Sequence, residues 1–508
     1  MEFLDFEIEI GLASGLDYPI MVRSAAGDAT ETMHFPFDEL ALESRLDKLQ
    51  IALLRSAGTY RRVITPEEQA VQDFGRDLFN ALLTGEIRSL FDLRYREAQA
   101  FGKGLRIKLR IRAPELAALP WEFMYDSRRG EFLCLSRYTP LVRYPELFQP
   151  TQPLAVTAPL RILGMIASPS DLPTLNVERE RQRVEEATKD LRNKKLLELI
   201  WLDGQTWRDL QKAMRGGPWH IFHFIGHGGF DVNREEGFMA LADDHGDTQR
   251  FHATQLARLL ADHSSLRFCL LNACEGARSS GRDIFSSTAS IVVRRGIPAV
   301  LAMQYEITDR AAVEFARAFY ESIADNMPVD AAVVEARKAV SLAVSGSVEW
   351  GTPVLYMRSS DGVLFNLTKG RTGRITQPSA GPVAARLVVR QGKQRGRVYP
   401  ITTVASTIGR ESSVSIFVDD NLISRRHARV FQQDNKLFIE DLGSRNGTFL
   451  NRKAITEPTE LKASDVIRVG DTVLEVELQP ATAPIQLASS GQDTEEVKLD
   501  EVIAEANE

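Results

Sequence analysis

Two short segments place a histidine and a cysteine where thiol chemistry could occur. Residues 220–231 read HIFHFIGHGGFD, and an apolar run leads into His227 between two glycines. Residues 268–276 read FCLLNACEG, and a second apolar run leads into Cys274. An imidazole beside a thiol can take the thiol proton and later return it to a leaving amine. The pattern therefore predicts a His227–Cys274 dyad for nucleophilic catalysis.

The positions of these residues carry more weight than their types. Each follows a run typical of a buried strand, and open parallel sheets gather reactive groups beyond the carboxyl ends of their strands. The glycines let a backbone approach a substrate closely. The N–H groups of Gly228 and Cys274 are then placed to bind an oxyanion. Cys269 and His223 lie inside the strand runs instead, and we expect both in the core.

A metal site is the alternative for the histidines. His220, His223 and His227 would share one face of a helix, but the Phe and Ile content favours a strand, which puts His220 opposite His223. No HExxH or CxxC pattern accompanies them. A Walker A sequence is also missing. We therefore predict no metal and no cofactor.

A second set of polar residues follows in the motifs TIGR, LISRRHA and DLGSRNGTFLN. Guanidinium forks suit phosphate oxygens, hydroxyls add donors, and an asparagine amide can bond a peptide backbone in both directions. The alternative is that these are turn residues with solvated charges, since Asn-Gly is a common tight-turn pair. No aromatic stacking platform accompanies the arginines, so we predict no nucleic-acid partner. The candidate binding residues are Arg410, Ser424, Arg425, Ser444 and Asn446.

Composition sets the broad class of protein. The chain has 508 residues, of which 44% are hydrophobic and 26% charged, as is usual for globular proteins of about three domains. The net charge of −7 gives no support for global nucleic-acid binding. Three cysteines indicate a reducing compartment. No segment resembles a signal peptide or a spanning helix, so we expect a cytoplasmic protein without a membrane partner.

The first part of the chain alternates between strand and helix patterns. Such alternation predicts an α/β fold with a mostly parallel sheet flanked by helices. The expected strands are 3–9, 18–23, 105–111, 160–166, 220–225, 266–273 and 299–304, and the expected helices are 40–54, 184–199, 254–261, 286–295 and 311–324.

The last part of the chain differs in character. Residues 368–383 are rich in Gly, Pro, Ser and Thr, which is typical of a linker. Short β-type runs separated by Gly, Asn and Asp turns predict an all-β sandwich over residues 384–478. Residues 479–508 are predicted to form a disordered acidic tail.

The histidine and cysteine segments support a family resemblance. GHG after one apolar strand and NACEG after the next resemble the caspase-like cysteine peptidases, and more closely the CHAT family of that clan. The blocks LPWEFMYD, GRDIF, GIPAVLAMQ and GTPVLYM resemble recurring blocks of the family. The resemblance identifies residues 100–367 as a CHAT caspase-like peptidase domain. Residues 1–99 resemble its N-terminal extension, a β-hairpin plus helices.

This resemblance implies a role for each matching residue. His227 would be the base and Cys274 the nucleophile, and Gly228 with Cys274 would form the oxyanion hole. Gln304 would lie on the strand that lines the substrate cleft. Asn272 stands two positions before the nucleophile, where caspases have Gln and relatives with a basic P1 preference often have Asp. Asn272 therefore does not indicate a basic P1 residue.

The C-terminal motifs resemble a forkhead-associated (FHA) domain. The resemblance implies binding of phosphothreonine peptides, with Arg410, Ser424 and Arg425 on the phosphate. Asn446 would hold the peptide backbone with help from Ser444. The implied partners are a phosphothreonine-containing protein, such as a substrate of a Ser/Thr kinase, and a protein substrate for cleavage.

These observations predict a cysteine endopeptidase in kinase-linked bacterial signalling, directed or regulated by its FHA domain. Many members of the clan are latent until a partner or a cleavage activates them. The alternative is a non-catalytic signalling scaffold, in which the caspase-like domain is degenerate and phosphothreonine binding is the only activity. Thr494 in the acidic tail is a candidate phosphorylated ligand for the protein's own FHA domain.

Overall fold

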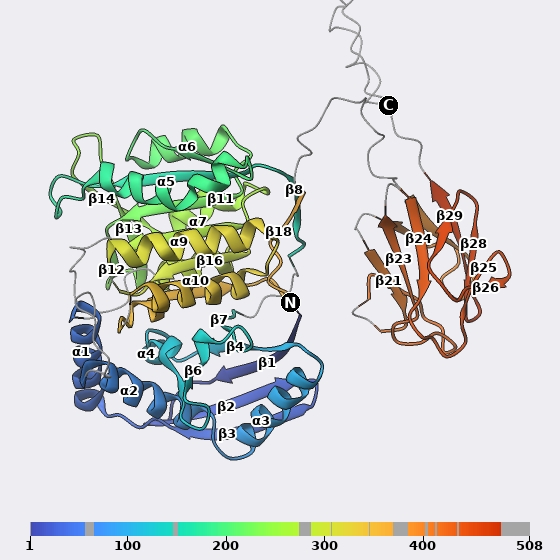
Figure 1. Cartoon of the computed structure of the whole chain (residues 1–508), viewed down its shortest axis with the longest axis horizontal. Coiled ribbons are helices and arrows are strands. Elements are labelled where there is room, and N and C mark those ends of the chain that lie inside the picture. The colour runs from blue at the N-terminus through green and yellow to red at the C-terminus, as the bar shows by residue number, and fades with distance from the viewer. Residues whose placement is uncertain are drawn as a thin grey trace, which may run out of the picture. The chain divides into compact units, whose positions relative to one another are not determined.

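The computed structural model of the chain shows two compact units, Met1–Arg371 and Thr372–Glu508 (Figure 1). Among the helices that it describes, none has the length and apolar character that crossing a bilayer requires. The described residues are 2–55, 66–145, 151–273, 286–305, 307–344, 346–368, 385–401, 405–411, 414–433 and 436–478.

The first unit is built on an eleven-stranded sheet (Figure 1). Its strand order is β10-β9-β11-β15-β16-β17-β7-β4-β1-β2-β3. Seven of its ten neighbouring pairs are parallel, which confirms the predicted α/β fold with a mostly parallel sheet. The strands are β1 (Phe3–Ile10), β2 (Asp17–Ser24), β3 (Gly27–His34), β4 (Gly104–Ile111), β7 (Leu141–Arg143), β9 (Leu160–Ala167), β10 (Leu197–Trp201), β11 (Ile221–Gly226), β15 (Phe268–Ala273), β16 (Ala299–Met303) and β17 (Pro353–Met357).

Helices flank this sheet, and aromatic contacts identify the face that α9 covers. The ring of Phe268 on β15 lies 5.0 Å from Phe319 of α9, and Nδ1 of His223 on β11 lies 2.9 Å from the Tyr320 hydroxyl. The longer helices are α1 (Glu39–Arg55), α2 (Pro66–Leu82), α3 (Gly85–Ala100), α5 (Val177–Asn193), α6 (Trp207–Arg215), α7 (Ala253–Ala261), α8 (Ser286–Arg294), α9 (Asp309–Ala324) and α10 (Val329–Ala343).

The helix predicted over 184–199 is partly wrong. Helix α5 begins at Val177, where the side chain of Asn176 caps it by accepting a hydrogen bond from the Arg179 N–H. It ends at Asn193, because Lys195 adopts a left-handed φ of 56° that stops the helix. The residues that follow form the edge strand β10 instead, which pairs in parallel with β9.

Two elements of the first unit were not expected from the sequence. One is helix α10, which is rich in Ala and Val and has most of its residues buried. A small antiparallel sheet directly follows His227. Its strands are β12 (Gly228–Asp231), β13 (Glu236–Ala242) and β14 (Thr248–His252), and the remaining short strands of the first unit are β5 (Tyr125–Asp126), β6 (Glu131–Phe132), β8 (Leu154–Thr157) and β18 (Phe365–Thr368).

The second unit confirms the predicted all-β sandwich. One sheet has the order β20-β19-β29-β28-β25-β26 and the other β22-β21-β23-β24-β27, and their apolar side chains form a single buried cluster. The strands are β19 (Ala385–Gln391), β20 (Val398–Ile401), β21 (Ala405–Gly409), β22 (Ile416–Phe417), β23 (Ala428–Gln433), β24 (Lys436–Asp441), β25 (Thr448–Leu450), β26 (Lys453–Ala454), β27 (Thr459–Leu461), β28 (Val466–Val469) and β29 (Thr472–Leu478).

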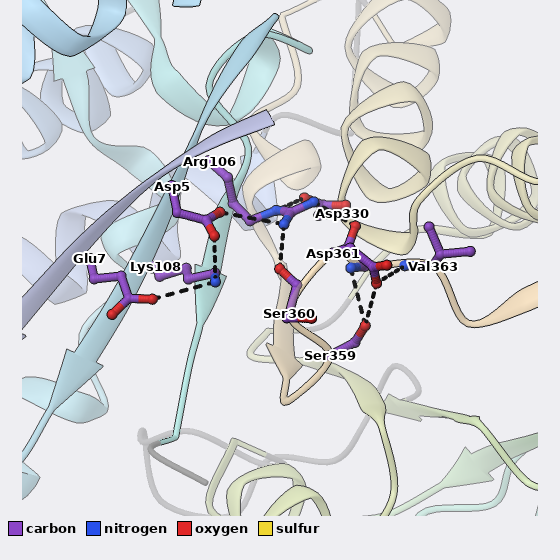
Figure 2. A network of polar contacts seen from close by, with 10 residues as sticks. Asp5, Glu7, Arg106, Lys108, Asp330, Ser359, Ser360, Asp361 and Val363 are labelled. Atoms are coloured by element: carbon purple, nitrogen blue, oxygen red, sulfur yellow. Dashed lines mark hydrogen bonds and ion pairs between the residues drawn. The ribbon is translucent and has the colours of Figure 1, made fainter. Parts of the chain in front are cut away.

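A buried polar network ties the N-terminal strands to the rest of the first unit (Figure 2). Arg106 on β4 donates from Nε to Asp330 of α10 over 2.6 Å. Its other nitrogens donate to the carbonyl oxygens of Ser360 and Asp361, each over 2.7 Å. Because the side chains of Arg106 and Asp330 are almost fully buried, each charge depends on the other for compensation. Asp5 on β1 extends the network with an ion pair to Arg106.

Replacing Asp330 by Ala should destabilise the first unit by about 3–5 kcal/mol, because a buried guanidinium loses its carboxylate. All five tryptophans lie in this unit, so tryptophan fluorescence during urea unfolding reports on it alone. The control is Asp244→Ala, which removes an exposed carboxylate paired with Arg208 at the surface. Equal unfolding midpoints for the two variants would contradict a stabilising role for the pair.

Candidate functional site

The register of β11 and β15 positions the predicted dyad. The two strands run in parallel, and their last paired residues are Gly226 and Ala273. The residues that come next in the sequence are His227 and Cys274. Cys274 itself lies outside the described residues. Neighbouring strands lie about 4.8 Å apart, so the chain leaves both strands at closely spaced points.

The side chain of His227 is buried, and among the described residues it has one hydrogen-bond contact, to a backbone carbonyl. Its Nε2 lies 2.8 Å from the carbonyl oxygen of Pro173, in the loop between β9 and α5. A carbonyl can only accept a hydrogen bond, so Nε2 carries the proton and Nδ1 bears the lone pair of the neutral imidazole. The backbone oxygen of His227 accepts a bond from the Ala240 N–H over 3.0 Å. Gly228 then opens β12, opposite Met239 of β13.

The two candidate substrate-binding residues, Asn272 and Gln304, lie on opposite faces of the sheet. Asn272 lies in register with Ile225, on the face that α9 covers, and its Oδ1 is buried without a partner among the described residues. Gln304 follows β16, and its Nε2 donates to the carbonyl oxygen of Ala118 over 3.4 Å. Alternation from Ala302 places Gln304 on the opposite face. The structure therefore brings Asn272, but not Gln304, to the His223 side of the sheet.

The other candidate histidines have separate structural partners. Nδ1 of His220 accepts from the Arg161 N–H over 2.9 Å, and burial lowers the pKa of His220 to about 4. His223 contacts Tyr320, and burial lowers its pKa to about 3. Across the described ranges, no three metal-ligating side chains cluster. Cys269 is fully buried, and burial raises the pKa of its thiol, so the expectation that Cys269 and His223 lie in the core is confirmed.

In the second unit, His427 joins three loops. Its Nδ1 accepts from the Ser424 N–H over 3.1 Å, and its Nε2 donates to the Gly447 carbonyl over 3.1 Å. Its backbone N–H bonds the Ile408 carbonyl at the end of β21. The three motifs that were widely spaced in the sequence therefore meet around one residue, His427.

The phosphate-binding candidates lie on two adjoining loops. The Arg410 N–H donates to the Ser424 carbonyl over 3.2 Å, and both arginine side chains, Arg410 and Arg425, are exposed. Gly409 permits this approach, because a Cβ there would lie 2.0 Å from the Arg425 carbonyl oxygen. The hydroxyl oxygen of Ser424 accepts from the Arg445 N–H, which leaves the hydroxyl proton available to donate.

The third loop holds Asn446 and Ser444 in different ways. Asn446 is exposed and donates from Nδ2 to the Leu422 carbonyl over 2.7 Å, which leaves its amide oxygen toward solvent. Ser444 instead donates its hydroxyl proton to Asp441 over 2.7 Å. Burial alone raises the pKa of Asp441, but hydrogen bonds from Ser444 and Thr448 outweigh burial and hold that pKa below its ordinary value. In this structure the Ser444 hydroxyl is therefore bonded to Asp441, within its own loop.

Sequence reasoning missed two carboxylates that shape these loops. Asp441 accepts from Ser444 and Thr448, and Asp420 accepts from the Leu422 and Asp471 N–H groups. An Asp beside Gly and Ser is a common signal for a side-chain-capped turn, and DLGS carries it. For Asp420, the Leu422 N–H lies two positions away, but the Asp471 N–H lies 51 positions away, and no local pattern predicts that second contact.

His427 should titrate below the ordinary histidine value of about 6.5, because burial lowers its pKa. As the pH falls, the unfolded state then takes up the proton first, so His427 reduces the stability of the second unit between about pH 6.5 and its folded pKa. NMR of the histidine Hε1 signals, assigned with His427→Gln, measures the midpoint. A midpoint at or above about 6.5 would contradict the neutral bridging geometry.

Comparison with known proteins agrees with these two architectures. The family model described as CHAT domain matches residues 72–350, which is more than half of the chain. The protein therefore belongs to the CHAT domain family. The model described as FHA domain matches residues 406–470 within the β-sandwich, so the chain also carries a C-terminal FHA domain. Both predicted resemblances are confirmed.

Curated relatives match the FHA region. The FHA domain-containing protein FhaB of Mycolicibacterium smegmatis is 34% identical over 94 residues, covering 18% of this chain and 61% of the relative. The oxoglutarate dehydrogenase inhibitor of Corynebacterium efficiens is 30% identical over 129 residues. This match covers 24% of this chain and 86% of the relative. The chain spans about three fifths of the length of several such relatives.

Solved structures also align with this region. A chain from a structural and functional analysis of phosphothreonine-dependent FHA domain interactions is 28% identical. The alignment covers 19% of this chain and 98% of that chain, with a TM-score of 0.18.

Proposed function

We propose that the protein is a cysteine endopeptidase that uses His227 and Cys274, directed by phosphothreonine binding at its FHA domain. The observation that carries the peptidase proposal is the register of β11 and β15, whose last paired residues directly precede the two dyad positions. Membership of the CHAT domain family supports the same assignment. The contact between His227 and Pro173 supports a base with its lone pair on Nδ1.

The proposed reaction has two stages. Nδ1 of His227 takes the proton from the Cys274 thiol, and the sulfur attacks the scissile carbonyl carbon to form a C–S bond. The oxyanion is bound by the N–H groups of Gly228 and Cys274. The C–N bond then breaks as the imidazolium returns its proton to the departing amine. Water hydrolyses the resulting thioester, which releases the acid and regenerates the thiol.

The contact between His227 and the Pro173 carbonyl suits this chemistry. A neutral imidazole with Nε2–H bonded to a carbonyl can become an imidazolium without losing that contact. Asn272 has a buried amide oxygen without a partner among the described residues, and we assign it to the substrate-contacting wall beside the dyad.

For the FHA domain we propose a phosphothreonine site formed by Arg410, Ser424 and Arg425. The contact between the Arg410 N–H and the Ser424 carbonyl supports this grouping, because it brings the backbone of Arg410 beside Ser424, which precedes Arg425 in the sequence. Asn446 is proposed to bind the backbone of the phosphorylated peptide. The partner would be a protein phosphorylated by a Ser/Thr kinase, and it would serve as substrate or regulator of the peptidase.

The rate of Cys274 alkylation by iodoacetamide should show whether His227 activates the Cys274 thiol. Thiolate reacts and thiol does not, so a thiol beside a base reacts at a pH well below about 8.5. We expect Cys274 alone to react quickly at neutral pH, and His227→Ala to slow it at least tenfold. Buried Cys134 and Cys269 are internal controls in the same mass spectrum. If Cys274 reacts like an ordinary thiol with and without a bound phosphopeptide, the scaffold alternative replaces the peptidase.

Substitution of Arg410 by Ala should weaken binding of a phosphothreonine peptide by roughly tenfold or more, because charge-assisted bonds to phosphate are lost. Fluorescence anisotropy with phosphorylated and unmodified peptides measures the difference. Arg426→Ala is the matched control, since Arg426 is also exposed and lies outside the proposed site. Cys274 alkylation should be unchanged in both variants. Equal affinities of the two variants would refute the assignment of Arg410.

A further inference from the structure

The carbonyl that holds His227 belongs to a loop with its own tertiary restraints. The loop spans residues 168–176 between β9 and α5, and Pro173 lies in its middle. At its base, the Ser168 N–H donates to the Gln205 side chain over 2.8 Å. The Ser168 hydroxyl oxygen in turn accepts from the Leu175 N–H over 3.0 Å. These contacts close the base of the loop but leave the position of Pro173 to other contacts.

A second set of contacts joins the loop to the β13–β14 hairpin. Oδ1 of Asp171 accepts from the N–H of Thr248 over 2.8 Å and from its hydroxyl over 2.6 Å. The Ser170 N–H donates to the Gly246 carbonyl, and its hydroxyl donates to Asp247 over 2.7 Å. We call these five residues the clasp. Asp171 stands only two positions before Pro173, so the clasp restrains the loop next to the carbonyl.

The hairpin end of the clasp is itself well ordered by hydrogen bonds. Oδ1 of Asp243 accepts from the N–H groups of His245 and Asp247, which fixes the turn between β13 and β14. The same hairpin holds the backbone of His227, since the Ala240 N–H donates to the His227 carbonyl. The backbone of the base and the carbonyl that binds its ring are therefore positioned by one structural element.

We propose that Asp171 is a positioning residue for His227, acting through Thr248 and the Pro173 carbonyl. The clasp keeps the carbonyl against Nε2, which holds the proton there and keeps the lone pair on Nδ1. This inference deepens the proposed function, because the Nδ1 lone pair matters for catalysis only if His227 activates Cys274. Asp171 touches no reacting atom in this scheme.

The chemistry of the Asp171 contact supports its importance. Two donors from one residue converge on a single carboxylate oxygen, and bonds to an ionised acceptor are stronger than neutral ones. The hydrogen bond from Thr248 holds the pKa of Asp171 below its ordinary value, so the carboxylate is ionised at neutral pH. The contact is exposed to solvent, so we expect a partial effect when it is removed.

The test measures the tautomer of His227 directly and its effect on Cys274 separately. In ¹⁵N-histidine-labelled full-length protein, the native His227 ring should be protonated at Nε2, with its signal assigned by His227→Ala. Asp171→Ala should give a mixture of tautomers and slow Cys274 alkylation at neutral pH by roughly tenfold. Asp171→Asn retains an acceptor oxygen without the charge and should lie between native and Asp171→Ala. The matched control is Asp244→Ala, which removes an exposed carboxylate next to the same turn and should match native protein.

The outcomes separate this inference from the proposed function. If His227→Ala leaves Cys274 alkylation unchanged, the dyad is wrong, and the tautomer measurement still decides the role of Asp171. If His227→Ala slows alkylation while Asp171→Ala matches native protein in tautomer and rate, the positioning role is refuted. Should Asp171→Ala fail to fold by tryptophan fluorescence, Thr248→Val replaces it, because it removes only the hydroxyl donor. A native tautomer and a native alkylation rate in both Thr248→Val and Asp171→Asn would then overturn the proposal.

Discussion

The parallel hydrogen-bonded register between β11 and β15 is the constraint on which the candidate active site depends. Backbone hydrogen bonds fix this register over six residue pairs, from Ile221–Phe268 to Gly226–Ala273. The ends of the two strands therefore cannot shift past one another without breaking the ladder. His227 and the β12–β14 sheet follow the end of β11, and Cys274 follows the end of β15 in the sequence. A rigid sheet with short extensions can position reactive groups more closely than loops alone.

Buried charged and polar groups hold the elements around this frame. Arg106 and Asp330 connect the N-terminal strands with α10, and Arg143 forms a two-point contact with Glu122 at 3.0 and 2.8 Å. The FHA domain uses the same principle on a smaller scale, since His427 joins its three loops through side-chain and backbone contacts. In each case a buried polar group is bonded to at least one partner distant in sequence, which selects one arrangement of those segments.

The two units are proposed to divide the work of recognition and catalysis. Exposed arginines on the FHA loops suit a phosphorylated partner, whereas His227 is buried and contacts the loop that bears Pro173. Each site is complete within its own unit as proposed. Phosphorylation of a partner would therefore set which protein is recruited without altering the groups that cleave it.

The sequence by itself determined the fold class, the two family resemblances and the residue types of both candidate sites. Local patterns suffice for these features, because strand runs, Gly-rich turns and motif spacing are all short-range. Only the tertiary structure decided that Asn272 and Gln304 lie on opposite faces, that Ser444 donates to Asp441, and that residues 197–201 form a strand. It also supplied the Pro173 and Asp171 contacts, whose partners lie 54 and 77 positions away. Hydrogen bonds across such separations depend on how the elements pack, which no local pattern encodes.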